Sequence, residues 1–209
     1  MAELTVADLV ERARGLAARG PRTVLGVTGP PGAGKSTLAR AVADALGPAV
    51  CALVPMDGFH LADATLRAWG RRDRKGACDT FDRDGYVALL RRLRAAEDEV
   101  VHAPDFDRTI DEPIGSAIPV PRTVPLVLTE GNYLLTAEDG WSRVAELLDE
   151  SWYVELDPAT RRDRLTLRHE RHGKSHDDAV AWTLGSDEAN AGVVTRGRER
   201  ADLVVRVRP

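Results

Sequence analysis

A glycine-rich segment, GPPGAGKST at residues 29–37, constrains this chain more than any other feature of its sequence. It fits the pattern G-x-x-x-x-G-K-[ST], in which glycines let consecutive backbone N–H groups turn toward phosphate oxygens. The apolar, β-branched run Thr23–Thr28 precedes it, and Lys35–Leu46 follows with the spacing of an amphipathic helix. Such a helix would point the positive end of its dipole at the phosphates. The segment therefore predicts a strand–loop–helix unit that binds a nucleoside triphosphate.

The residue types in this loop predict separate roles. Lys35 would reach the outer phosphates, and the Ser36 hydroxyl would ligate Mg²⁺. Lysine occurs in this chain only at Lys35, Lys75 and Lys174, so its presence inside the motif strengthens the prediction. The alternative is a glycine-rich turn that only caps a helix, and the flanking strand and helix patterns disfavour it. The predicted nucleotide-binding residues of the loop are Gly29, Pro30, Pro31, Gly32, Ala33, Gly34, Lys35, Ser36 and Thr37.

Strand-like and helix-like segments alternate along the chain, which predicts an α/β fold with a parallel sheet covered on both faces. The expected strands are 23–28, 50–55, 124–128, 152–156 and 203–207. The expected helices are 5–19, 35–46, 61–69, 84–97, 141–148, 158–172 and 177–184. Two further stretches, Gly70–Asp82 and Ala103–Pro121, are rich in Pro, Gly, Asp and Arg. Their length predicts functional loops rather than simple connectors.

The bulk composition excludes several classes of function. The chain has 209 residues, 30% charged residues and a net charge of -4, so a general affinity for nucleic acid is not expected. No apolar run approaches the roughly 18 residues of a membrane span. The two cysteines, Cys51 and Cys78, lack metal-site spacing, which predicts reduced thiols and a cytoplasmic location. The basic stretch Arg67–Lys75 is either a solvated loop or a site for an anion.

Two carboxylates follow predicted strands and would lie at the same sheet edge as the phosphate loop. Asp57 follows Val50–Pro55, and Glu130 ends the run that begins at Pro125. The carboxyl ends of parallel strands converge on one edge. There Asp57 could accept the proton of an attacking hydroxyl, and Glu130 could help to hold Mg²⁺. The alternatives are an Asp57 that caps a helix or starts a turn before Gly58, and a Glu130 exposed at a strand end.

Other features favour a kinase over other triphosphate-binding classes. The N-K-x-D tetrapeptide typical of GTPase switches does not occur, and the strand before Gly131 ends in Glu130 rather than in Asp-Glu. The predicted helix Pro158–His172 carries guanidinium groups at helical spacing, which could neutralise a transferring phosphoryl group. The alternative is a solvated face paired with nearby acids. The arginines on this face are Arg161, Arg164, Arg168 and Arg171.

Six stretches resemble, in order, the uridine kinase, pantothenate kinase and phosphoribulokinase group of P-loop kinases. They are GPPGAGKST, PMDGFH, RKGACDTFD, APDFDRTIDEP, TEGNY and the segment around RHERHGKS. The chain is most similar to the bacterial uridine kinase-like branch, described as nucleoside or fructose-transport-system kinases. The resemblance implies a P-loop NTPase three-layer sandwich with a five-stranded parallel sheet, an Arg-rich lid, Mg²⁺, and ATP as the phosphoryl donor.

The resemblance also implies one kinase domain over residues 1–209. Its parts would be an N-terminal helix in 1–20, acceptor-binding insertions in 57–121 and a lid in 158–185. The implied catalytic residues are Asp57, Lys35 and Arg168, with Arg164 and Arg171 beside ATP. The implied metal ligands are Ser36, Glu130 and Asp57. The implied acceptor-binding residues are His60, Asp82, Phe106 and Asp107, and Arg83 beside Asp82 is a further candidate for the acceptor pocket.

The acceptor stays open at this stage. His60 and Phe106 stand where relatives often carry tyrosine, and Asp111 stands near a position where uridine kinases carry a base-reading histidine. A nucleoside is the first expectation, a sugar or sugar phosphate the second, and pantothenate the third. A non-catalytic ATP-binding regulatory module is the alternative from another class. The expected partners are ATP and a small-molecule acceptor, without nucleic acid or membrane, and a homodimer is compatible with the sequence.

Overall fold

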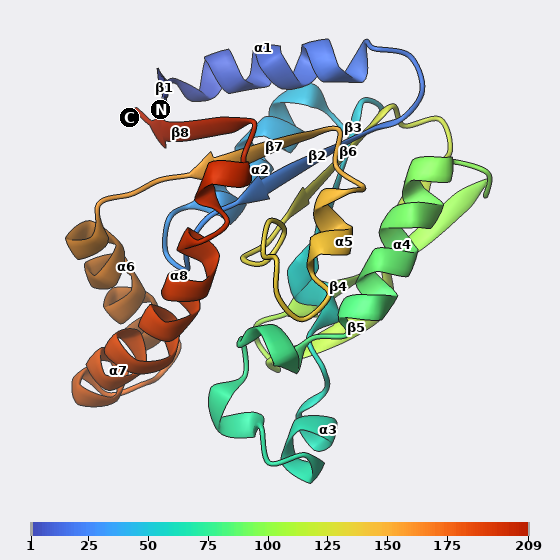
Figure 1. Cartoon of the computed structure of the whole chain (residues 1–209). Helices are drawn as coiled ribbons and strands as arrows, with labels where there is room; N and C mark the ends of the chain where they lie inside the picture. The colour runs from blue at the N-terminus through green and yellow to red at the C-terminus, as the bar shows by residue number, and fades with distance from the viewer. Residues whose placement is uncertain (1, 209) are drawn as a thin grey trace.

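The structure is a computed structural model that describes residues 2–208. Its central element is a sheet of six parallel strands in the order β1–β8–β7–β2–β6–β3 (Figure 1). The strands are β1 (Ala2–Leu4), β2 (Thr23–Thr28), β3 (Cys51–Pro55), β6 (Leu126–Glu130), β7 (Glu150–Val154) and β8 (Leu203–Val207). All residues of β2, β6 and β7 are buried, as expected for apolar strands covered on both faces.

The expectation of five strands is wrong by one strand. Strand β1 precedes the first helix and pairs with β8, with Glu3 opposite Arg206. Three residues are too few to show a strand pattern in the sequence. The helix α1 (Val6–Ala17) then begins after Thr5, which forms a capping box with Asp8. The predicted N-terminal helix therefore exists, but a strand stands in front of it.

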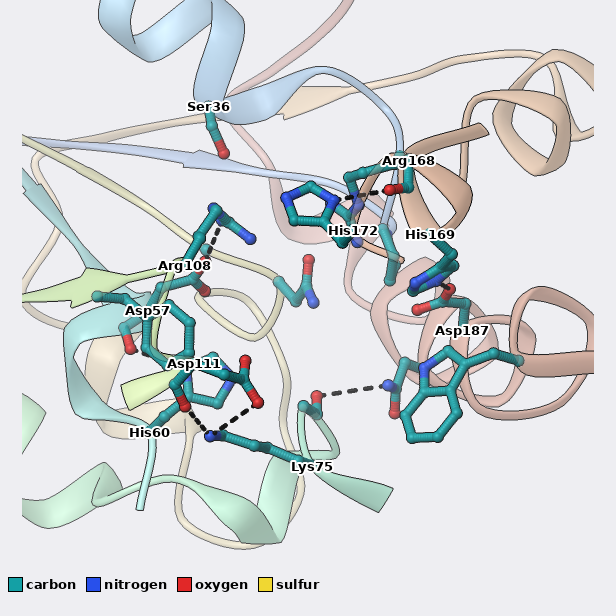
Figure 2. A pocket seen from close by; sticks show the side chains of 18 of the residues that line it. Ser36, Asp57, His60, Lys75, Arg108, Asp111, Arg168, His169, His172 and Asp187 are labelled. Carbon is teal, nitrogen blue, oxygen red and sulfur yellow. Dashed lines mark hydrogen bonds and ion pairs between the residues drawn. The ribbon is translucent and has the colours of Figure 1, made fainter. Parts of the chain in front are cut away.

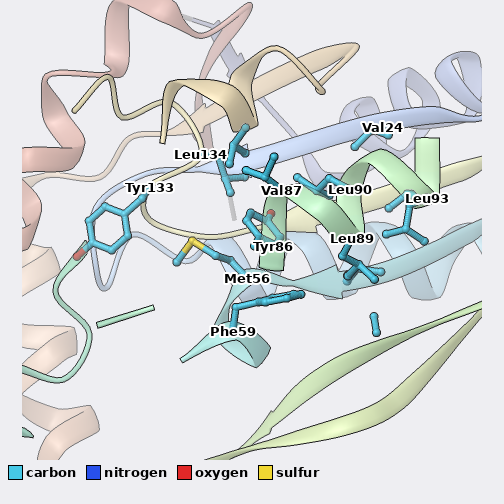
Figure 3. Close-up of a cluster of buried hydrophobic side chains, with 14 of the residues drawn as sticks. Val24, Met56, Phe59, Tyr86, Val87, Leu89, Leu90, Leu93, Tyr133 and Leu134 are labelled. Atoms are coloured by element: carbon cyan, nitrogen blue, oxygen red, sulfur yellow. The ribbon is translucent and has the colours of Figure 1, made fainter. Parts of the chain in front are cut away.

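Two apolar layers enclose the sheet and confirm the three-layer sandwich. On one face, α1 and α2 (Lys35–Leu46) pack against sheet side chains such as Leu25. On the other face, α4 (Arg83–Ala95), α5 (Ser142–Ala145) and α8 (Glu188–Thr195) pack against side chains such as Val24. Neighbouring residues of β2 thus point to opposite layers, as strand geometry requires. Figure 3 shows the second layer, where Tyr86 and Leu90 of α4 lie beside Met56 and Leu134.

The stretch Ala103–Pro121 is not the loop that its composition predicted. Strands β4 (Val100–Asp107) and β5 (Glu112–Pro121) pair antiparallel as a two-stranded hairpin outside the main sheet. Residues 108–111 form its turn, and Asp111 has a φ of 56° there. The hairpin packs beside Met56–Phe59, the 3₁₀ turn that follows β3. A segment of apparent loop composition therefore places its turn next to the end of a central strand.

The C-terminal third forms a helical arm beside the phosphate loop. It contains α6 (Pro158–Arg171), α7 (His176–Trp182), a π-helical turn at Thr183–Asp187, and α8. The sequence predicted helices at 158–172 and 177–184 and missed α8. Figure 1 shows α6 and α7 at one side of the sheet, apart from α3 (Asp63–Ala68) and its neighbouring turns. Within residues 2–208, no helix is long and apolar enough to span a membrane.

Candidate active site

The glycine-rich loop lies between β2 and α2, tightly enclosed by the backbone of β7 and by side chains of α6. Gly29 has a φ of 147°, and a Cβ there would stand 2.5 Å from the carbonyl oxygen of Val154. Gly32 has a φ of 80°, and a Cβ there would stand 2.7 Å from Cγ of Leu165 in α6. Only glycine meets both the backbone and the space requirement at these positions. The loop is thus shaped by close approach of the sheet and of the arm that follows it.

The start of α2 leaves its backbone donors available to phosphate. Its first flanking residue, Gly34, is left-handed and has no side chain to cap the helix. The first turn of α2 carries no acidic residue either. Free N–H groups and the positive end of the helix dipole therefore face the loop. Lys35 is buried in the first turn, and its Nζ donates to the Pro30 carbonyl oxygen at 3.1 Å.

Hydroxyl and carboxylate oxygens gather beside this cradle. The Ser36 Oγ donates to Oε1 of Glu130 at 2.7 Å. Glu130 is buried at the end of β6, and burial raises the pKa of its carboxyl, with the negative charge of Asp57 as a second cause. A divalent cation would relieve both the desolvation and the repulsion between these carboxylates. Hard oxygen donors of this kind suit Mg²⁺, so Ser36, Glu130 and Asp57 fit the predicted metal ligands.

Lys35 offers a pH test of the cradle. Burial lowers its pKa to about 8, and the positive charges of Arg168 and Arg108 act in the same direction. A bound triphosphate would favour the charged amine and raise this pKa. We expect ATP affinity to be constant below pH 8 and to fall by up to about tenfold per pH unit above it.

The measurement is the dissociation constant of ATP by calorimetry between pH 7 and pH 10, in two buffers of different ionisation enthalpy. Proton uptake on binding should appear near pH 8 and above. The variant Lys35→Arg keeps its charge and should show no such fall. A constant affinity of the wild-type protein up to pH 10 would contradict a phosphate-contacting Lys35.

A cleft of about 470 Å³ extends from the phosphate loop. Nine of the predicted residues line it: Pro31, Gly32, Lys35, Ser36, Asp57, His60, Phe106, Glu130 and Arg168. Figure 2 shows Ser36 at one end, Asp57 and His60 on one wall, and Arg168 on the opposite wall. His60 packs between the rings of Phe81 and Phe106, with centroids 4.1 and 4.7 Å away. The cleft therefore joins the donor cradle to a wall that is partly aromatic.

His60 presents a hydrogen-bond acceptor rather than a charge to this cleft. Its Nδ1 lies 2.7 Å from the backbone carbonyl oxygen of Asp57. A carbonyl oxygen only accepts, so Nδ1 carries the proton of this bond. Burial lowers the pKa of His60, which favours the neutral ring. The neutral ring leaves Nε2 with a free lone pair, which suits a hydroxyl or N–H group of an acceptor.

The four arginines of α6 that were predicted for the site have different surroundings. Arg168 lines the cleft. Arg164 lies over the phosphate loop, with Nη1 3.9 Å from the place of a Cβ on Gly34. Arg161 is buried, and its Nη1 donates to the Pro31 carbonyl oxygen while its Nη2 pairs with Glu188. Arg171 is exposed near the end of α6, outside the cleft lining.

Three predicted acceptor-binding residues are not part of the cleft lining. Asp82 caps α4, where its carboxylate accepts from the Gly85 N–H at 2.9 Å. Arg83 pairs with the adjacent Asp84. The Asp107 carboxylate accepts from the N–H and hydroxyl of Thr109 in the hairpin turn. Each of the three therefore has a local partner, and none of them lines the cleft.

The basic stretch Arg67–Lys75 is largely paired with carboxylates of its own region. Arg67, Arg72 and Lys75 contact Asp63, and Arg71 and Arg74 contact Asp79. Lys75 is nearly buried and also pairs with Asp111 of the hairpin turn. The stretch is therefore neither a simple solvated loop nor an unoccupied patch of positive charge. It holds the turns after α3 against the hairpin.

The sequence reasoning missed several residues that line the cleft. Arg108 follows Asp107 in APDFDR, and Asn132 follows the predicted Glu130–Gly131 step, so both were adjacent to recognised motifs. His169 and Asp187 form a contact of 2.7 Å between α6 and the π-helical turn. No local pattern could reveal that contact, because it depends on the fold of the arm.

Comparison with known proteins assigns this site to a family. A family model described as "ATPase family associated with various cellular activities (AAA)" matches residues 25–77, which contain the phosphate loop. The Schizosaccharomyces pombe protein "Putative uridine kinase C227.14" is 31% identical over 95% of this chain and 88% of its own length. The chain belongs to the uridine kinase and pantothenate kinase group of P-loop kinases.

Two further comparisons support this assignment. The crystal structure of a "putative fructose transport system kinase" from Silicibacter sp. TM1040 is 37% identical. It superposes with a TM-score of 0.86 and covers 96% of this chain and 98% of that chain. A "Pantothenate kinase" of Nocardioides sp. is 33% identical over 68% of this chain and 47% of its own length. The chain is therefore a P-loop kinase of the small-molecule type.

Proposed function

We propose that this kinase transfers the γ-phosphoryl group of ATP to a hydroxyl group of a small molecule, with Mg²⁺ as the cofactor. The convergence of Lys35, Ser36, Glu130 and Asp57 at one end of the cleft carries this proposal. It combines a phosphate cradle, oxygen donors for a cation and a carboxylate on the acceptor side. These are the parts that phosphoryl transfer requires.

Each side chain then has a defined task in the transfer. Lys35 and the N–H groups of the loop hold the phosphates, and Arg168 faces them from the lid. The acceptor hydroxyl oxygen forms a bond to the γ-phosphorus as the bond between that phosphorus and the bridging oxygen of ADP breaks. The hydroxyl proton passes to Asp57. Mg²⁺ on Ser36 and Glu130 would supply charge neutralisation, and positioning accounts for much of the remaining rate.

A nucleoside is the proposed acceptor, with a sugar or sugar phosphate second and pantothenate third. The aromatic wall of His60, Phe81 and Phe106 could support a planar base, and the Nε2 of His60 could accept from a hydroxyl or N–H group. The relatives named for uridine, fructose transport and pantothenate supply the three acceptor classes.

The test is a screen of the purified protein with ATP and Mg²⁺ against a panel of acceptors. The panel contains uridine, cytidine, fructose, ribose phosphates and pantothenate, and products are identified by mass. We expect an added mass of one phosphoryl group on a single class of acceptor. Slow loss of ATP without any phosphorylated product would instead favour a non-catalytic regulatory module.

A further inference from the structure

A cation of the hairpin reaches the centre of the proposed site. Arg108 lies in the turn between β4 and β5, and its Nη2 donates to Oδ2 of Asp57 at 2.9 Å. Figure 2 shows this guanidinium beside Asp57, on the wall opposite Arg168. Arg108 also lines a second cavity, together with Ser36 and Glu130. It therefore stands at the boundary between the oxygen donors of the metal site and the acceptor wall.

Three cations from three separate elements face this point. Lys35 comes from α2, Arg168 from α6 and Arg108 from the hairpin turn. All three side chains line the same cleft, together with Glu130 and Asp57. Like charges are placed together in this way where an anion is to be bound.

The surroundings of Arg108 do not resemble those of a structural arginine. Its side chain is 51% exposed, and its polar partner is a carboxylate of the site. Arg161, by contrast, is 4% exposed and tied to Glu188 and to a carbonyl of the loop. An exposed ion pair contributes roughly 0–1 kcal/mol to stability, so the fold gains little from this contact. A flexible and half-exposed guanidinium can exchange one anionic partner for another.

We propose that Arg108 is a catalytic residue that leaves Asp57 and binds the oxygens of the transferring phosphoryl group. This inference rests on the proposed function. Without nucleotide, the ion pair between Arg108 and Asp57 positions the carboxylate and neutralises the charge of the guanidinium. The arriving triphosphate competes for the guanidinium, which frees Oδ2 of Asp57 to accept the acceptor proton. Arg108 then faces the γ-phosphoryl group while the bond to ADP breaks and the bond to the acceptor oxygen forms.

The test uses ADP, Mg²⁺ and aluminium fluoride, which together mimic a phosphoryl group in transfer. The variants are Arg108→Ala and Arg108→Lys. Arg122→Ala is the matched control, because Arg122 is exposed just beyond β5 and outside both cavities. Calorimetry measures the affinity for ADP with and without aluminium fluoride. The wild-type protein and the control should gain affinity when fluoride is added.

We expect the dissociation constant of ADP for Arg108→Ala to stay within about twofold of the wild-type value. The increase in ADP affinity that aluminium fluoride causes should be at least about tenfold smaller in this variant than in the wild-type protein. Arg108→Lys should keep part of that gain, because it keeps the charge but not the planar fork. With an acceptor from the panel, kcat of Arg108→Ala should fall by about 10²-fold at an unchanged KM for ATP.

If aluminium fluoride increases the ADP affinity of Arg108→Ala as much as that of the wild-type protein, the role of Arg108 is overturned. The proposed function would stand in that case, because ADP binding would still support it. A higher KM for the acceptor at unchanged kcat would also overturn it, because Arg108 would then bind the acceptor. Failure of the wild-type protein to bind ADP would overturn the proposed function together with this inference.

Discussion

Replacement of Asp57 by asparagine is expected to lower kcat by about 10²–10⁴-fold and to leave the dissociation constant of ATP nearly unchanged. The amide cannot accept the hydroxyl proton, but it keeps the size of the side chain. Asp57 lies on one wall of the 470 Å³ cleft, where its carboxylate accepts from Arg108 and its backbone carbonyl contacts Nδ1 of His60. Loss of the carboxylate therefore removes the proton acceptor without removing the phosphate cradle.

The measurement combines steady-state turnover on the acceptor found in the panel with ATP affinity by calorimetry. Asp73→Asn provides the matched control, because Asp73 is exposed in the turn after α3 and outside the cleft. That control should retain wild-type kcat. Turnover of Asp57→Asn within tenfold of wild type would show that another group accepts the proton. A large loss of ATP affinity would show instead that Asp57 acts mainly through the metal.

Replacement of Arg22 by methionine is expected to lower the free energy of unfolding by about 3–5 kcal/mol. The buried guanidinium of Arg22 donates to three carbonyl oxygens, at 2.9 Å to Val124, 3.0 Å to Leu93 and 2.5 Å to Pro121. Val124 belongs to the segment before β6, Leu93 lies near the end of α4, and Pro121 ends β5. Methionine fills similar space but leaves all three acceptors without this donor.

The expected fall in melting temperature is about 6–20 °C for a chain of this size. Circular dichroism during heating and chemical denaturation measure it. Arg91→Met is the control, because Arg91 lies exposed on α4 close to the same region. It should change stability by at most about 0.5 kcal/mol. A fall of less than about 1 kcal/mol in Arg22→Met would show that water replaces the guanidinium at these carbonyls.

Local patterns predicted where the phosphate loop and the neighbouring carboxylates lie in the fold. The loop at residues 29–37 lies between a strand and a helix as expected, and Lys35 and Ser36 face the cleft. Asp57 and Glu130 also line it, because parallel strands end at a common edge. Glycine content, strand pattern and helix spacing act over a few residues, so the sequence displays them directly.

The acceptor half depended on contacts between distant segments. The hairpin of β4 and β5 brings Arg108 to Asp57 across 51 residues, and composition alone had suggested a loop there. Asp82 was expected in the pocket, but its carboxylate caps α4, which is a local preference of that residue type. The carboxylate of Asp82 thus has a local partner that its place in the motif did not indicate.

The sequence by itself determined that this chain holds a triphosphate and which strand ends carry carboxylates, because these properties follow from short-range backbone preferences and strand order. The tertiary structure decided which cations meet those carboxylates. It added β1 to the sheet through pairing with β8 and turned the basic stretch inward through Asp63 and Asp111. It also set Arg108 opposite Arg168. Charged side chains from separate elements come together only when the chain has folded, so no local sequence pattern predicts their contact.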